Sequence, residues 1–182
     1  MDGVLVDWLN GLRKAGGLPE SIFDGFRADP SILNSRNISS SFGSREVVDK
    51  LMDASYPEFW INLEIFPWAD FLVTELKNNF DVVFVTSPGG CEAACQGKWA
   101  WKKLFYPGTS MIITRDKFLA ASETKILVDD DDFQLNKFAE AGGFAIKWAN
   151  QFYMEKLSLD EIKVEIGRLI KVIKEYEKQL NL

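Results

Sequence analysis

Hydrophobic residues in the second half of the chain gather in four short runs in which β-branched side chains are frequent. The runs are DVVFVT (81–86), SMIIT (110–114), KILVDD (125–130) and GGFAIKW (142–148). Short continuous apolar runs of this kind are typical of strands buried in a parallel sheet. The segments between them space their apolar residues as helices do, at 91–105, 116–123 and 133–141. This alternation predicts a doubly wound α/β domain.

The first half of the chain follows a different pattern. Residues 8–65 contain two helical stretches, DWLNGLRKAGG (7–17) and SREVVDKLMDAS (44–55), and a turn-rich linker over 27–44. We interpret residues 8–65 as a small helical cap inserted over the mouth of the sheet. An amphipathic helix at 67–79 then leads into the strand at 81–86, so that residues 1–7 and 66–182 form the α/β core.

The end of the chain predicts a long helix. Ser158 and Glu161 have the spacing of a capping box. Apolar residues follow at helical spacing, namely Ile162, Ile166, Leu169, Ile170, Ile173, Tyr176 and Leu180. We expect this helix to pack on the sheet; the alternative is a contact in a homodimer.

Composition excludes several classes of function. The 182 residues carry a net charge of -6, which argues against binding to polymeric nucleic acid. No apolar run reaches the roughly 18 residues of a membrane span, and we expect a cytoplasmic location. The chain has no histidine and only two cysteines. This excludes Ser-His-Asp and Cys-His catalysis and zinc sites of the usual kind.

Polar residues collect where the predicted strands end. Asp2 and Asp7 flank the first apolar run, and the other groups are Thr86–Ser87, Thr114–Lys117 and Asp129–Asp132. Each group alone is typical of a turn or a solvated loop. Active sites of parallel α/β sheets lie beyond the carboxyl ends of the strands, so these groups together predict a site.

The chemistry of these groups is that of a phosphate and Mg²⁺ site. Carboxylates such as Asp2, Asp129 and Asp130 are the hard oxygen ligands that Mg²⁺ prefers. The helix that follows Pro88-Gly89-Gly90 points its N-terminus at the same place, which favours a phosphate. Lys98, Arg115 and Lys117 supply positive charge in an otherwise acidic chain. The ligand that fits this combination is a phosphomonoester.

The same segments resemble the motifs of a known group of enzymes. DGVLVD (2–7), FVTSP (84–88), GKWAWKKLF (97–105) and ILVDDDD (126–132) resemble, in order, motifs of the haloacid dehalogenase-like (HAD) phosphatases. IITRDK (112–117) and PEFWINLEIFPWA (57–69) are similar to segments of the 5'(3')-deoxyribonucleotidases within that superfamily. The resemblance covers residues 2 to about 132.

The resemblance implies a role for each site residue. Asp2 would be the acid and base and would bind Mg²⁺ through its backbone carbonyl, while Lys98 would neutralise nucleophile and phosphate. Thr86 and Ser87 would hold the transferring phosphate, with Arg115 and Lys117 on the substrate side. Asp130 would ligate the metal beside Asp129. Three aromatic residues would stack on a base or, alternatively, pack inside the cap: Trp8, Phe59 and Trp60.

The resemblance also concerns the start of the chain. It places the nucleophilic aspartate, which forms an aspartyl-phosphate, two residues before Asp2, and a central first strand before that, between the strands at 82–86 and 126–129. We therefore expect this chain to be N-terminally incomplete and to lack phosphatase activity as it stands. The expected substrate is a nucleoside monophosphate. Alternatives are a HAD phosphatase of another small phosphomonoester and a non-catalytic protein that binds a phosphate ligand.

Overall fold

Four short parallel strands lie within two residues of their predicted positions in the computed structural model, which describes residues 2–54, 57–89 and 92–180. They are β1 (Val83–Thr86), β2 (Ser110–Ile113), β3 (Ile126–Asp129) and β4 (Phe144–Lys147). β1 pairs with β2, and β3 pairs with β4. Within the described residues no ladder joins the two pairs, so the predicted parallel sheet is present as two pairs. The mixed α/β class is confirmed.

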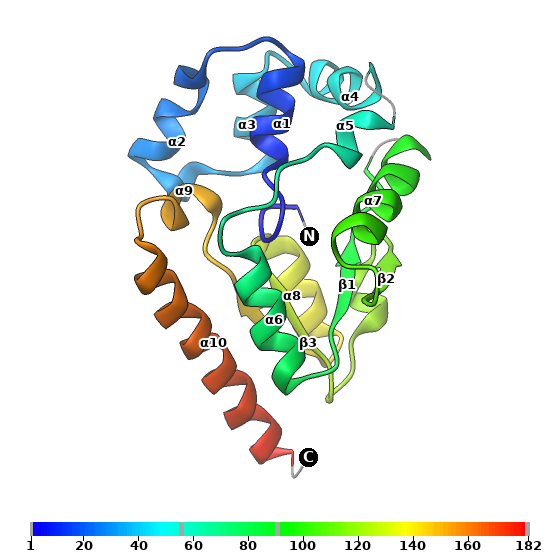
Figure 1. Cartoon of the computed structure of the whole chain (residues 1–182), viewed down its shortest axis with the longest axis vertical. Helices are drawn as coiled ribbons and strands as arrows, with labels where there is room; N and C mark the ends of the chain where they lie inside the picture. The colour runs from blue at the N-terminus through cyan, green and yellow to red at the C-terminus, as the bar shows by residue number, and fades with distance from the viewer. Residues whose placement is uncertain (1, 55–56, 90–91, 181–182) are drawn as a thin grey trace.

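Helices pack around the strand pairs (Figure 1). They are α6 (Ala69–Asn79), α7 (Glu92–Phe105), α8 (Asp132–Glu140) and α10 (Leu159–Gln179), with the short 3-10 helix η3 (Lys117–Ala120). The predicted capping box of α10 is present: the Ser158 side chain accepts from the Glu161 N–H, and the Glu161 carboxylate accepts from the Ser158 N–H. The buried face of α10 packs mainly against α6 rather than on the strands. It meets the predicted sheet at Tyr176, whose ring is stacked on Phe144 of β4 with centroids 4.1 Å apart.

The first part of the chain is helical and lies together at one end of the molecule (Figure 1). We call residues 8–61 the helical region. Its elements are α1 (Trp8–Ala15), η1 (Glu20–Phe23), α2 (Asp24–Ala28), η2 (Pro30–Ile32), α3 (Ser35–Ser41), α4 (Arg45–Ala54) and α5 (Glu58–Ile61). No strand is found among its described residues, as predicted.

The prediction of a turn-rich linker over residues 27–44 is wrong in part, because the helix α3 lies within this segment. The Asn34 side chain caps α3 by accepting a hydrogen bond from the Asn37 N–H, and Ile38 is buried. Serine has a modest helix propensity, so the sequence of α3 resembled a linker. A capping side chain and one buried contact are enough to stabilise a helix of two turns in this setting.

Two segments run side by side between the helical region and the strands, and we call them the neck. The Asp7 N–H donates to the Glu64 carbonyl at 3.0 Å, and the Phe66 N–H donates to the Leu5 carbonyl at 3.0 Å. A bridge between Val6 and Ile65 lies between these two bonds. The outgoing and returning chains are therefore held together at this point.

A short helix that the sequence pattern did not predict, α9 (Gln151–Met154), contacts α2 of the helical region. Its Phe152 ring is stacked on Phe26 at 5.7 Å between centroids and is tilted against Phe23 at 5.4 Å. The helical region is thus joined to the rest of the molecule at the neck, at α9 and through α5, which packs against α7. None of the helices in the described part of the chain is long and apolar enough to cross a membrane.

Candidate functional site

A cavity of about 790 Å³ lies between the carboxyl ends of the strands and the helical region. Its strand-side lining consists mainly of polar and charged residues: Asp2, Thr86, Ser87, Lys98, Lys117, Asp129 and Asp130. The helical region contributes a mixed lining that includes Trp8, Asn34, Ile38, Ser39, Arg45, Met52 and Trp60. Most of the residues predicted from the strand ends therefore meet at one place.

Lys98 is the most buried charged residue of this cavity, with 1% of its surface exposed. It projects from α7, and its Nζ donates to the Asp2 carboxylate, to the Ser87 carbonyl at 2.8 Å and to the Thr86 hydroxyl at 3.3 Å. The ammonium group also lies 4.5 Å from the centre of the Trp60 ring. A lysine ammonium has three donors, and all three reach oxygen acceptors here. Lys98 thus connects the N-terminal loop to the end of β1.

The carboxylate of Asp2 is the counterion of Lys98. Burial alone would raise the pKa of Asp2, but the positive charges around it, that of Lys98 first, outweigh burial and hold the pKa below its usual range. Its Oδ1 atom is buried and has no hydrogen-bond partner among the described residues. Asp2 is therefore ionised and retains one free acceptor atom.

A second lysine and carboxylate pair lies beside the first. Lys117, at the start of η3, donates its Nζ to Asp129 Oδ2 at 2.5 Å, and both side chains are buried. The other oxygen of Asp129 accepts from the Asp131 N–H at 3.0 Å. Both carboxylate oxygens of Asp129 are thus engaged by the protein itself.

Asp130 differs from its neighbour because no lysine side chain pairs with its carboxylate in the described contacts. Burial first, and then the charge of Asp129, raise the pKa of Asp130 to about 6. Its carboxylate lies against Gly3, where an added Cβ would approach Asp130 Oδ2 to 2.2 Å. Gly3 has a φ of +74°, so both its backbone conformation and this close approach require glycine. Asp2 and Asp130 are therefore brought to adjacent positions of the cavity.

The carboxylates fit a divalent cation in part. The carboxylate of Asp130 is a hard oxygen donor that pairs with no lysine among the described contacts. The resemblance assigns the second ligand to the backbone carbonyl of Asp2, which leaves the unpartnered Oδ1 of Asp2 for proton transfer. Asp129 would have to share an oxygen that already accepts a hydrogen bond, so it suits the role of a neighbour better than that of a ligand. In the described residues no three such side chains are grouped closely enough to hold a metal ion together.

Four other predicted residues have different surroundings. Arg115 donates to the Gly89 carbonyl at 3.1 Å and is not among the residues that line the cavity. Phe59 is buried, packs edge-on against Trp60 with centroids 4.9 Å apart, and does not line the cavity either. Trp8 and Trp60 do line it, and the buried Nε1 of Trp60 has no partner among the described residues. For Phe59 the structure agrees with the packing alternative.

The sequence analysis missed several residues of the cavity wall. They include Asn34, Ser39, Arg45, Lys147, Asn150 and Gln151. Asn34 and Asn150 are N-caps of α3 and α9, so a capping signal could have located them, although not as part of a cavity. Lys147 ends β4, so the strand-end rule that located the other polar groups could also have found it. No local pattern marks Ser39, Arg45 and Gln151, because they reach the cavity through the packing of helices that are distant in the sequence.

Comparison with known proteins gives no further guide to this site. No family model matches the sequence, and no match was found among the curated proteins.

Proposed function

We propose that the cavity is a Mg²⁺-dependent phosphomonoester site of the HAD-like type, and that its ligand is a nucleoside monophosphate. The observation that carries the proposal is the position of Lys98. Its ammonium group is buried at the cavity wall and joins the Asp2 carboxylate, the end of β1 and the Ser87 carbonyl. Its match with the lysine segment of the family resemblance supports the assignment.

The charges of the cavity support binding of a phosphate. A phosphomonoester carries almost two negative charges at neutral pH. Lys98 and Lys117 both line the cavity of a chain whose net charge is -6. The carboxylates beside them would repel a phosphate unless a cation separates the two. Asp2 and Asp130 would hold the Mg²⁺, which when bound neutralises phosphate oxygens.

Asp2 is suited to proton transfer in such a reaction. Asp2 lines the cavity, and its Oδ1 has no protein partner among the described residues, so this carboxylate is placed to exchange a proton with a leaving oxygen or a water molecule. A bound phosphate dianion would oppose the effect of Lys98 and raise the pKa of Asp2, which favours uptake of the proton. Ligand binding tests this assignment without requiring turnover.

The size and lining of the cavity support a nucleotide as the ligand. A volume of about 790 Å³ lies in the range of about 300–1,000 Å³ that is usual for small-molecule sites. The rings of Trp8 and Trp60 line it and offer apolar surface to a base. Other small phosphomonoesters, and binding without catalysis, remain alternatives that the following experiment separates.

Isothermal titration calorimetry of the chain with dUMP, deoxyuridine and ribose 5-phosphate, each with and without Mg²⁺, tests the proposal. We expect dUMP to bind only with Mg²⁺, and deoxyuridine, which lacks the phosphate, to bind at least tenfold more weakly. Lys98→Met should weaken dUMP binding by more than tenfold. Lys103→Met, on the exposed face of the same helix, is the matched control and should bind as the wild type does.

Two results would contradict the proposal. One is equal binding of deoxyuridine and dUMP, and the other is unchanged binding of dUMP by Lys98→Met. Ribose 5-phosphate binding as tightly as dUMP would favour the alternative of a different phosphomonoester. If dUMP binds as expected, an assay of phosphate release from dUMP distinguishes an enzyme from a non-catalytic binding protein.

A further inference from the structure

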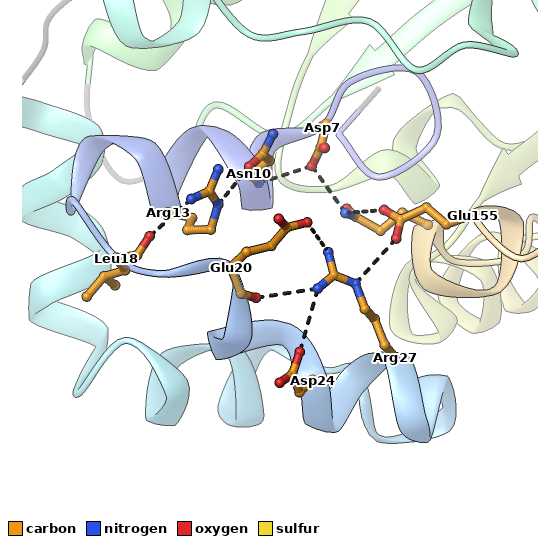
Figure 2. Close-up of polar contacts among 9 residues, drawn as sticks. Asp7, Asn10, Arg13, Leu18, Glu20, Asp24, Arg27 and Glu155 are labelled. Atoms are coloured by element: carbon orange, nitrogen blue, oxygen red, sulfur yellow. Dashed lines mark hydrogen bonds and ion pairs between the residues drawn. The ribbon is translucent and has the colours of Figure 1, made fainter.

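A second cluster of charged groups joins the helical region to α9, and we call it the seam (Figure 2). Its centre is Gln151 of α9, which is 3% exposed. Gln151 Nε2 donates to Asp7 Oδ1 at 3.1 Å and reaches Glu155 Oε1 at 3.4 Å. Two carboxylates from opposite sides of the seam therefore share one amide group.

The positive charge available to these carboxylates is divided among several acids. Arg27 of α2 lies 2.7 Å from Glu20 Oε1, 3.7 Å from Asp24 Oδ1 and 3.9 Å from Glu155 Oε2 (Figure 2). The shortest contact of Arg27 is with Glu20 and its longest is with Glu155. Glu155 therefore receives the weakest share of this charge.

The groups that face Asp7 also offer it little positive charge. Lys14 pairs with Glu64 at 2.5 Å, and the charge of Glu64 acts on Asp7 as well. Arg13 donates to the neutral oxygens of Asn10 and Leu18 (Figure 2). The seam therefore contains more acids than its cations can neutralise.

Both shared carboxyls hold a proton more strongly than a free carboxyl does. Burial raises the pKa of Asp7, despite the hydrogen bonds from the Asn10 N–H and Gln151. Burial also raises the pKa of Glu155, and the charge of Asp7 raises it further. The closed seam is thus more stable when the pair carries a proton than when both groups are ionised.

The seam is placed where its separation would open the cavity. Asp7 belongs to the neck and is the N-cap of α1, so it lies where the chain enters the helical region. Next to the seam, the Asn150 side chain donates to the Pro30 carbonyl at 2.8 Å. Pro30, Asn150 and Gln151 all line the cavity. This contact between α9 and the helical region is therefore part of the cavity wall.

We propose that the seam is a proton-sensitive latch: it holds the helical region against α9 while Asp7 or Glu155 is protonated, and it loosens when both are ionised. The stabilisation is complete below the ordinary carboxyl pKa and is lost as the pH rises through the raised pKa of the pair. The expected consequence is easier access to the cavity at higher pH. This inference concerns the protein without ligand and does not depend on the proposed function.

Hydrogen–deuterium exchange of the ligand-free protein between pH 5 and pH 8, corrected for the intrinsic exchange rate at each pH, tests the latch. We expect the protection of peptides from residues 20–33 and 150–157 to fall severalfold as the pH rises, while α6 shows no such trend. Glu155→Gln and Asp7→Asn should each weaken the trend, because each removes one of the two titrating carboxyls. Arg27→Gln should strengthen it, because it removes the cation that favours ionisation of Glu155 and lowers its pKa.

The controls make the outcome decisive. Glu165→Gln changes a carboxylate of α10 that pairs with Arg168 outside the seam, and it should leave the trend intact. Asp7→Asn retains a residue type that caps helices well, so it tests the latch even if Glu155→Gln does not fold. A wild-type seam whose protection does not change with pH would overturn the proposal, as would a trend that persists unchanged in a folded Asp7→Asn or Glu155→Gln variant.

Discussion

Lys98 and Lys117 both line the cavity, but their ammonium groups have different surroundings. Lys117 and Asp129 form a closed pair, because both side chains are buried and the second oxygen of Asp129 is bound by the Asp131 N–H. Lys98 is equally buried, but its partner Asp2 retains 24% of its side-chain surface and has a free Oδ1. The first pair is complete within the protein, whereas the second leaves one acceptor atom without a protein partner among the described residues.

The difference separates a structural role from a binding role. A buried ion pair whose remaining atoms are all satisfied positions its elements, here η3 against β3, and loses much if one member is removed. An ion pair beside a cavity that keeps one unpartnered atom can exchange protein contacts for ligand contacts with a smaller loss of stability. The predictions that follow test this distinction, from the largest expected effect to the smallest.

Lys117→Met should destabilise the fold most, by about 3–5 kcal/mol, because it leaves the carboxylate of Asp129 buried without a counterion. Urea unfolding followed by circular dichroism measures the change. Lys117→Met/Asp129→Asn should recover a large part of the loss, because the double variant no longer buries a charge. Failure of the double variant to recover stability would show that packing, rather than charge, makes Lys117 important.

Lys98→Met should cost less stability, about 1–3 kcal/mol, the range for leaving buried acceptors unsatisfied. Asp2 is partly exposed and can be solvated from the cavity once the lysine is gone. The same unfolding experiment measures this loss, and Lys103→Met gives the baseline for α7. A loss equal to that of Lys117→Met would remove the distinction between the two pairs.

Asp130→Asn should stabilise the metal-free protein at pH 7 by about 1–2 kcal/mol. The pKa of Asp130 is raised to about 6, so wild-type stability falls as the pH rises from about 4 to 6, and the penalty is complete at pH 7. The asparagine variant avoids it. Thermal unfolding with and without Mg²⁺ measures both parts of the expectation: the variant should begin with a higher Tm and should gain less from Mg²⁺ than the wild type does.

Asp7→Asn should give the smallest effect, visible mainly as a change in pH dependence. Asp7 lacks a lysine partner and its pKa is raised by burial, so its contribution to stability is lost as the pH rises through that raised pKa. The difference in unfolding free energy between variant and wild type should therefore grow in favour of the variant from pH 4 to pH 7. A difference that does not vary with pH would contradict the pKa direction.

Much of the local structure was predictable from the sequence because it depends on neighbouring residues. Strand positions follow from apolar runs such as VFVT (83–86) and ILVD (126–129), and the start of α10 follows from Ser158 and Glu161. The gathering of polar residues at the strand ends follows from the geometry of parallel strands. These features require only the residue pattern and the direction of the chain.

The tertiary structure alone decided how these residues are used. Phe59 and Trp60 are adjacent in the sequence, yet only Trp60 lines the cavity, since α5 presents them to different neighbours. Gln151 lies 144 residues from Asp7 in the sequence. It becomes the shared donor of the seam only because α9 meets the neck in the folded chain. Burial and partner distance set the properties of the carboxylates and lysines of the site, and both depend on contacts between segments that the order of residues does not reveal.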